Sequence, residues 1–497
     1  MPSHNMLVSQ SVANDTRHGS QSQVCEAVSE YVSTVCQQMR WKKARERVSD
    51  ELTSHIADSR DAYLSQGLNE ADATASAITD TGDAAIVGTQ LDRVHRPKPQ
   101  WGMLGTSAVL IILGLLVYAY FTGGLTANRL LFTGVGVAGL VGAYFIDFTW
   151  LAKYPKTLLF AVSATSLVVP FMRLTRRGAP FDASVFNHAG SGIQFYSIED
   201  AIVLIFPLVL AVIVFYAKGK GYWGLIITGL SFALLVMVAF GIAVSGAGRF
   251  TITGFLLLGI AVAKGMFNTK KLSAALVACG PVTVLYLIAL VLNMTNEFAR
   301  RALSERIIIF FDPSFAPYTR GYWPMVTRGV LREAAWFGRG NSEWWLNLLY
   351  YPPVGVSYRS ALSALIGLTG WVSFVVIVIA LLFFIIKGAK RCFRQKSNLG
   401  LLVSSAVMLT FAVQAIEYVI YNMGFQVVRP VALPLVVSDN VAFIVNAVLI
   451  GFMLSVFRTG DAVVDRVATH DVKAGRIISW DDGKLIINFK PLSDQGT

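Results

Sequence analysis

Basic and aromatic side chains alternate in one long stretch of this sequence, the outer segment, residues 295–355. Its arginines are Arg300, Arg301, Arg306, Arg320, Arg328, Arg332 and Arg339, and its aromatic residues include Phe310, Phe311, Phe315, Tyr322, Trp323, Trp336, Trp344 and Trp345. Guanidinium groups form forked hydrogen bonds to phosphate oxygens, and aromatic rings collect at the interface between membrane and water. The segment therefore has two interpretations: an interfacial belt that pairs with lipid phosphates, or a site for a lipid-linked diphosphate whose sugar lies outside the bilayer.

Acidic residues are scarce in the apolar part of the chain, so the few present there are candidates for chemistry. Glu417 lies inside an apolar block and must face either the interior of a helix bundle or a water-filled cavity. Asp439 lies at the mouth of another apolar block, where a carboxylate is costly unless it contacts protein or water. Asp439 has a second interpretation as a helix N-cap, and Asp312, which precedes Pro313, has one as a turn residue.

The composition indicates which elements must position these groups. Hydrophobic residues make up 54% of the chain and charged residues 14%, whereas soluble domains contain about 25% charged residues. The formal net charge is +12, but Lys and Arg lie mostly in short links between apolar blocks, which indicates membrane topology and argues against nucleic-acid binding. The four cysteines show no CxxC spacing, so neither a disulfide framework nor a metal site is expected.

Ten windows of about 20 apolar residues follow the first hundred residues, each long enough to cross the hydrocarbon core of a bilayer. They cover residues 101–121, 130–148, 156–172, 199–217, 222–245, 250–267, 272–294, 361–386, 399–421 and 434–457. Every second link between these windows is rich in lysine, so these links fall on the same side of the membrane, as expected of cytoplasmic loops. The pattern predicts an all-α polytopic membrane domain over residues 97–458, with both termini in the cytoplasm and the outer segment outside. No apolar block precedes Trp101, so no N-terminal signal peptide is expected.

Residues 1–24 are polar and lack a hydrophobic period, which predicts a disordered lead, and residues 25–96 have apolar residues at helical spacing, which predicts a cytoplasmic helical domain. Within it, Asn69 followed by Glu70 and Asp72 is typical of a helix N-cap. The domain resembles the permease prefix domain of bacterial membrane proteins at Gly67-Leu68, Ala71 and Gly82-Asp83. The resemblance implies a docking or regulatory module, and the alternative is a helical cap without separate activity.

A cytoplasmic tail is expected over residues 459–497. Two short runs of alternating polarity flank Asp482-Gly483, a dipeptide that favours a tight two-residue turn. The tail therefore predicts a short β-hairpin, with a disordered tail as the alternative.

Two sets of residues in the membrane domain match one family pattern. In the outer segment the pattern is an arginine, apolar residues, Asp-Pro, Gly-Tyr and Gly-x-Gly, matched by Arg306, Asp312, Pro313, Gly321, Tyr322, Gly338 and Gly340. In the last two windows the matching residues are Gln414, Asn422, Gly424, Leu433, Pro434, Asn446, Gly451 and Arg458. These residues resemble the SEDS family, the FtsW, RodA and SpoVE group, over about residues 101–458.

The resemblance implies a function in cell division or cell shape. SEDS proteins polymerise the glycan strands of peptidoglycan from lipid II in the bacterial cytoplasmic membrane, beside a class B penicillin-binding protein that crosslinks them. By this likeness, lipid II or a similar polyprenyl-diphosphate sugar would bind at the outer leaflet. The residues expected to bind it are Arg306, Gly321, Tyr322, Arg328, Arg339, Ser357, Arg359, Pro434, Ser438 and Asn440.

The essential aspartate of the family has no counterpart in this sequence. The family pattern places it just before the eighth span, where a general base or metal-holding carboxylate would help a sugar hydroxyl to lose its proton. The aligned position holds Ser357 or Arg359, neither of which supplies a carboxylate. One explanation is a relocated acid, and the candidates are Asp439, Asp312 and Glu343. The other is that polymerisation is lost while lipid or partner binding is retained.

Three functions therefore stay open: glycan-strand polymerisation, a catalytically inactive scaffold or regulator of a penicillin-binding protein, and a flippase or transporter of a lipid-linked substrate. The missing aspartate favours the scaffold, and the arginine-rich outer segment favours substrate binding. Glu417 and Asp439 near membrane depth favour a transporter, but the sequence has no inverted repeat. No cofactor is predicted, and a divalent cation beside a relocated acid is left open.

Overall fold

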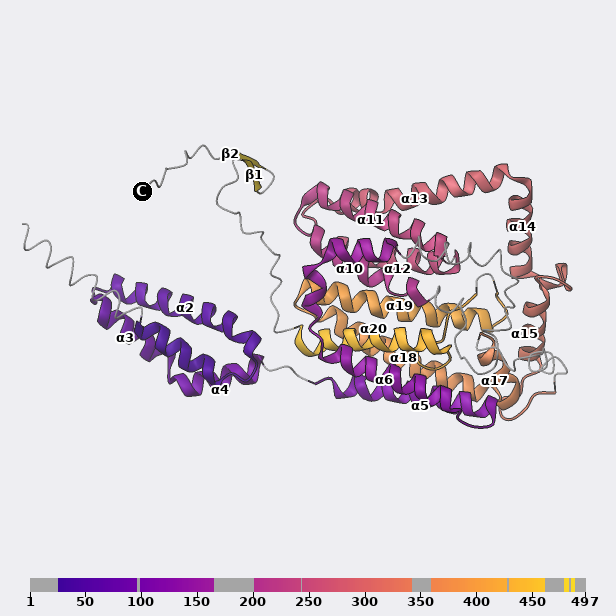
Figure 1. Ribbon diagram of the computed structural model, residues 1–497, viewed down its shortest axis with the longest axis horizontal. Coiled ribbons are helices and arrows are strands. Elements are labelled where there is room, and N and C mark those ends of the chain that lie inside the picture. The colour runs from indigo at the N-terminus through magenta and orange to yellow at the C-terminus, as the bar shows by residue number, and fades with distance from the viewer. Residues whose placement is uncertain are drawn as a thin grey trace, which may run out of the picture. The chain divides into compact units, whose positions relative to one another are not determined.

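The computed structural model shows a helical chain that divides into two compact units, with the boundary between Pro99 and Gln100 (Figure 1). The smaller unit precedes the boundary, and the larger one contains the apolar helices. The structure describes residues 26–95, 99–164, 201–242, 244–341, 359–426, 429–460, 478–481 and 484–487.

The described residues of the smaller unit, 26–95, form four helices around an apolar core. Residues 26–38 form the first helix, followed by α2 (Lys42–Ser65), α3 (Glu70–Thr81) and α4 (Ala84–His95). Residues that recur at helical spacing, among them Val35 and Ile56, are fully buried in the core. The side chain of Asn69 accepts a hydrogen bond from the backbone of Asp72, which confirms the predicted N-cap of α3.

Eight helices in the described part of the chain are long and apolar enough to cross a membrane, and Ala201–Ala217 is a shorter apolar helix. The predicted all-α polytopic fold is confirmed, and the chain is a multi-pass membrane protein. The helices of this unit are α5 (Trp101–Thr122), α6 (Ala127–Phe145), α10 (Phe206–Ala217), α11 (Gly221–Ile242), α12 (Val244–Ala263), α13 (Lys271–Thr295), α17 (Ala361–Thr369), α18 (Trp371–Phe393), α19 (Asn398–Asn422) and α20 (Asn440–Thr459). A short 3-10 helix, η1 (Phe148–Lys153), follows α6. The third predicted span is described only as far as Ala164.

Among the helix boundaries that differ from the apolar windows, two are explained by close packing or a tight turn. The window 361–386 is divided into α17 and α18 by Gly370, which has a φ of 92° that favours glycine. A Cβ at Gly370 would lie only 2.4 Å from the carbonyl oxygen of Trp336, so the close approach of the outer segment also requires glycine. The window 434–457 is helical only from Asn440, because the preceding residues form a tight turn.

The outer segment contains α14 (Glu297–Phe311), the 3-10 helix η2 (Pro313–Phe315) and α15 (Tyr322–Arg332). In Figure 1, α14 leaves the end of α13 and runs crosswise to it toward α15. Ile309 is the one buried residue of α14, whereas α15 buries Pro324, Val326, Thr327 and Val330. The arginines and aromatic rings of α14 are therefore presented mainly on exposed surface.

The C-terminal part contains the predicted pair of strands. β1 (Ile478–Asp481) and β2 (Lys484–Ile487) pair antiparallel, with Asp481 opposite Lys484. The predicted turn residues Asp482 and Gly483 lie outside the described residues.

Candidate functional site

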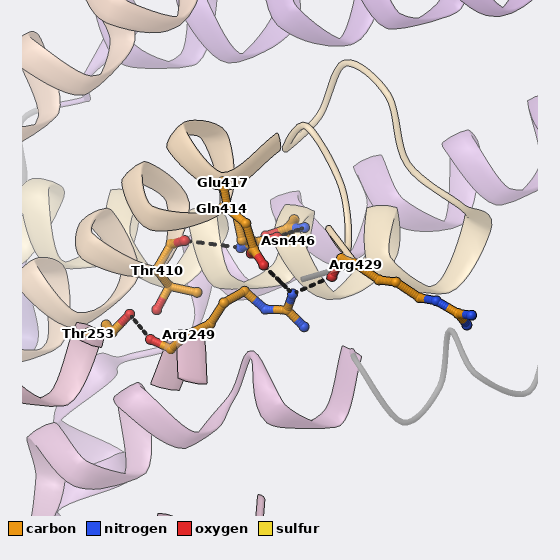
Figure 2. Close-up of polar contacts among 7 residues, drawn as sticks. All are labelled: Arg249, Thr253, Thr410, Gln414, Glu417, Arg429 and Asn446. Carbon is orange, nitrogen blue, oxygen red and sulfur yellow. Dashed lines mark hydrogen bonds and ion pairs between the residues drawn. The ribbon is translucent and has the colours of Figure 1, made fainter. Parts of the chain in front are cut away.

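A buried ion pair joins α12 to α19 near the end of the bundle where α19 stops and α20 begins. Arg249 donates from Nη1 to both carboxylate oxygens of Glu417, at 3.1 Å each, and to the backbone carbonyl of Arg429 at 3.0 Å (Figure 2). The Arg249 and Glu417 side chains are 7% and 19% exposed. Opposite charges at membrane depth stabilise one another because little water is present to solvate them. Glu417, the predicted intramembrane acid, therefore lies against α12.

Side-chain amides extend this polar region into the bundle. Gln414, three residues before Glu417 on α19, exchanges hydrogen bonds with Asn446 of α20 at 3.1 and 3.3 Å (Figure 2). Gln414 also donates to the carbonyl of Thr410 at 3.2 Å. A cavity of ≈ 10 Å³, room for about one water molecule, is lined by Arg249, Gln414, Thr410 and Thr253 with apolar side chains. The polar groups of α12, α19 and α20 thus meet in the bundle interior.

A second buried arginine lies at the start of α6. The Arg129 residue is 5% exposed, and its Nη1 donates to the carbonyl of Ser438 at 3.1 Å and to Oδ1 of Asn440 at 3.3 Å. Its guanidinium carbon lies 5.2 Å from the ring centroid of Tyr118 and 5.4 Å from that of Phe443, within the range of cation–π attraction. The structure therefore brings two predicted ligand-binding residues, Ser438 and Asn440, to an arginine that the sequence did not single out.

Residues 429–439, the entry segment of α20, carry several predicted site residues. Asp439 has extended backbone, and its Oδ1 accepts from the backbone N–H of Ala442 at 2.7 Å, so it is the N-cap of α20. Pro434 lies in a tight turn closed by two hydrogen bonds between Leu433 and Val437, at 2.7 and 2.9 Å. The turn is buried, and a Cβ on Gly114 of α5 would lie 2.4 Å from the carbonyl oxygen of Val436.

Arg328 ties the outer segment to the end of α19. It donates to the carbonyls of Phe310, Phe311 and Gly424 at 2.5, 2.9 and 3.2 Å, and its guanidinium lies 4.7 Å from the ring centroid of Phe425. These contacts use three of its five N–H groups within the protein. Partial burial lowers the pKa of Arg328 from its usual value.

Asp312 closes the turn between α14 and η2. Its Oδ1 accepts from the hydroxyl of Ser314 at 2.5 Å and from the backbone N–H of the same residue at 3.0 Å. These two hydrogen bonds, helped by the positive charge of Arg328, hold the pKa of Asp312 below its usual range. The carboxylate is exposed and takes the position of a turn residue.

The remaining predicted site residues lie away from the residues above or outside the residues that the structure describes. Arg306 is exposed on α14, whereas Arg301 and Arg320 form ion pairs with Glu297 and Glu305. Gly321 and Tyr322 begin α15, and Gly321 lacks space for a Cβ, which would lie 2.1 Å from the carbonyl oxygen of Pro313. Arg339 lies exposed beyond the end of α15. Glu343 and Ser357 lie outside the described residues.

Arg359 is anchored through its backbone to α19. Its carbonyl accepts from Nδ2 of the buried Asn422 at 2.9 Å, and Oδ1 of Asn422 accepts from the backbone N–H of Ser363 at 2.9 Å. The guanidinium groups of Arg359 and Arg429 both lie within electrostatic reach of Tyr421. Two arginines therefore bring positive charge toward a tyrosine at this end of the bundle. In the described residues no group of three His, Cys, Asp or Glu side chains could hold a metal ion.

No family model matches the sequence, and no curated protein matches it either. Among solved structures, a chain of a peptidoglycan synthase complex, described as coordinating polymerization and crosslinking, superposes with a TM-score of 0.52 at 15% identity. The match covers 72% of this chain and 98% of that chain. This chain has the fold of that chain. Two structures of the rod shape determining protein RodA of Thermus thermophilus, one of them a point mutant, match with a TM-score of 0.47 at 12% identity, over 73% of this chain and 98% and 97% of theirs.

Proposed function

We propose that this chain is a SEDS-type protein of bacterial cell-wall synthesis that binds lipid II or a similar polyprenyl-diphosphate sugar at the outer leaflet. The observation that carries the proposal is the fold, which matches a chain of a peptidoglycan synthase complex over 98% of that chain's length. The family pattern in the outer segment and in the last two helices supports the same conclusion from the sequence. In this proposal both termini are cytoplasmic, and the entry segment of α20 faces the outside.

The ligand site is proposed at the entry-segment end of the bundle. A diphosphate carries charge that guanidinium groups bind well, and Arg359 and Arg429 both lie within electrostatic reach of Tyr421 there. Ser438 and Asn440 would contact the sugar or phosphate oxygens, and Arg306 on α14 would guide the headgroup toward them. A class B penicillin-binding protein is the proposed partner, because the matching chain belongs to a complex that combines polymerization with crosslinking.

Within this function, the second candidate is a protein that binds the ligand without polymerising it. The contacts of three acidic side chains favour this candidate. Asp439 caps α20, Asp312 closes a turn, and Glu417 is paired with Arg249. A general base needs a carboxylate that can reach the substrate hydroxyl, and all three of these are engaged by the protein itself.

The test is a glycan-polymerisation assay with purified protein, labelled lipid II and a class B penicillin-binding protein present or absent. Asp439→Asn is the informative variant, because asparagine caps a helix about as well as aspartate but cannot accept a proton. Polymer that disappears in Asp439→Asn identifies an active enzyme with a relocated acid. Lipid II binding without polymer supports the second candidate, and the absence of both refutes the proposed function.

A further inference from the structure

Arg129 is a charged residue buried among apolar helices. It is the third residue of α6 and is 5% exposed, although α6 is apolar enough to cross a membrane. An arginine near a helix end usually extends its side chain toward water, and one that stays buried needs polar partners in the protein. The partners of Arg129 in the protein must therefore compensate the burial of its charge.

The side-chain hydrogen bonds of Arg129 go to residues at the beginning of α20, whereas its backbone N–H donates to Thr126. The carbonyl of Ser438 and the side chain of Asn440 accept its two hydrogen bonds, and Asp439 between them lies within electrostatic reach. Phe443, one turn into α20, supplies one of the two rings beside the guanidinium. The side chain of Arg129 thus contacts Ser438 just before the N-cap, Asn440 just after it, and Phe443 one turn into α20.

The entry segment needs such a restraint because its own backbone is irregular. Leu435 has a φ of 63°, in the left-handed region that residues with a side chain rarely adopt. The tight turn around it holds its conformation through the Leu433 and Val437 hydrogen bonds and through packing against Gly114. These contacts involve residues of the turn itself, and the three residues that follow it, Ser438, Asp439 and Asn440, carry the side chains suited to a ligand.

We infer that Arg129 is a positioning residue, which holds Ser438, Asp439 and Asn440 in place at the start of α20 and thereby sets the affinity for the lipid-linked ligand. This inference rests on the proposed function. Arg129 acts through the entry segment, because its hydrogen bonds go to protein groups.

The chain offers a matched control at the opposite end of the same helix pair. Arg458 in the last turn of α20 lies 4.7 and 5.2 Å from the ring centroids of Tyr144 and Phe145 and donates to the carbonyl of Phe145 at 3.4 Å. It therefore joins α20 to α6 by the same kind of contact, but it touches no residue of the entry segment in these contacts. A purely structural role predicts similar effects of Arg129→Gln and Arg458→Gln.

The experiment measures two quantities on the full-length protein in lipid nanodiscs. The first is the Kd for labelled lipid II in wild type, Arg129→Gln, Arg129→Lys and Arg458→Gln. The second, measured without lipid II, is the rate of maleimide labelling after Ser438→Cys, in a background whose four native cysteines are replaced by alanine. Residue 438 is 6% exposed, so slow labelling reports an ordered entry segment.

We expect Arg129→Gln to raise the Kd at least tenfold and to speed labelling several-fold, with Arg129→Lys intermediate and Arg458→Gln near wild type in both. Equal effects of Arg129→Gln and Arg458→Gln would overturn the inference. So would faster labelling with an unchanged Kd, because Arg129 would then order the segment without setting affinity. If wild type binds no lipid II, the proposed function fails, and the link to affinity fails with it, while the labelling rates still report whether Arg129 orders the segment.

Discussion

Replacing Glu417 by glutamine tests whether the ion pair between α12 and α19 supports the bundle. The substitution keeps the size of the side chain and removes its charge. Arg249, which is 7% exposed, would keep its hydrogen bond to the Arg429 carbonyl but lose its counter-charge. A buried cation without a counter-charge is unfavourable, because neither water nor an opposite charge compensates it.

The expected cost follows from the burial of the pair. Removing one partner of a buried pair costs about 3 to 5 kcal/mol. The Glu417 side chain is 19% exposed, so water compensates part of the loss and we expect the lower end of that range. A loss of about 3 kcal/mol corresponds to a decrease of roughly 150-fold in the folding equilibrium constant.

The assay is the unfolding free energy of the full-length protein in mixed detergent micelles. Glu297→Gln is the control, because its partner is Arg301 and the two side chains are 64% and 76% exposed. An exposed pair of this kind contributes about 0 to 1 kcal/mol. The double variant Arg249→Met with Glu417→Leu should recover most of the stability, because apolar side chains of similar volume need no counter-charge. If Glu417→Gln costs no more than Glu297→Gln, or if the double variant is as unstable as the single one, the reasoning is wrong.

Three further predictions concern the entry segment and the outer segment. Gly114→Ala should destabilise the protein by about 1 to 3 kcal/mol, because its new methyl group meets a backbone carbonyl, whereas Gly134→Ala, with no atom within 4 Å, should not, as thermal unfolding will show. Asp312 has a lowered pKa, so its contribution to stability is complete above the unfolded pKa of about 3.9 and is lost as the pH falls toward the folded value. Asp312→Asn should therefore flatten the acid unfolding curve followed by tryptophan fluorescence. Arg306→Gln should weaken lipid II binding more than Arg301→Gln, because Arg301 is already ion-paired, and a binding titration compares the two.

The sequence predicted the membrane fold because long apolar windows have few alternatives in a bilayer. The boundaries at Gly370 and Asn440 were beyond it, since hydropathy averages over a window and does not register one residue with a positive φ or a buried tight turn. Both breaks occur where another part of the chain packs closely, at Trp336 for the first and at Gly114 for the second. Such contacts depend on tertiary structure and have no local signal.

The sequence could predict those site residues whose role depends on their neighbours in the chain. Asp439 as an N-cap and Asp312 as a turn residue were available as interpretations from their neighbours in sequence, and the structure has both. Arg129 was not, because an arginine at the edge of an apolar window is typical of a side chain that reaches the interface. Its burial depends on residues 309 and 311 positions away in the sequence. A charge immediately next to the predicted span 130–148 was the signal that could have found it.

Arg359 could contribute to ligand binding but not to proton transfer. A carboxylate there could accept a proton from a sugar hydroxyl, whereas a guanidinium stays protonated at any physiological pH and can only donate hydrogen bonds. Arg359 and Arg429 lie within electrostatic reach of Tyr421. Among the described acids, Asp439 caps a helix, Asp312 closes a turn and Glu417 forms an ion pair. The aligned position of the family aspartate holds Ser357 or Arg359, and both lack a basic carboxylate, while Arg359 would also strengthen attraction for a diphosphate. Under the proposed function, an arginine at that position favours the second candidate, a protein that binds the lipid-linked ligand without polymerising it.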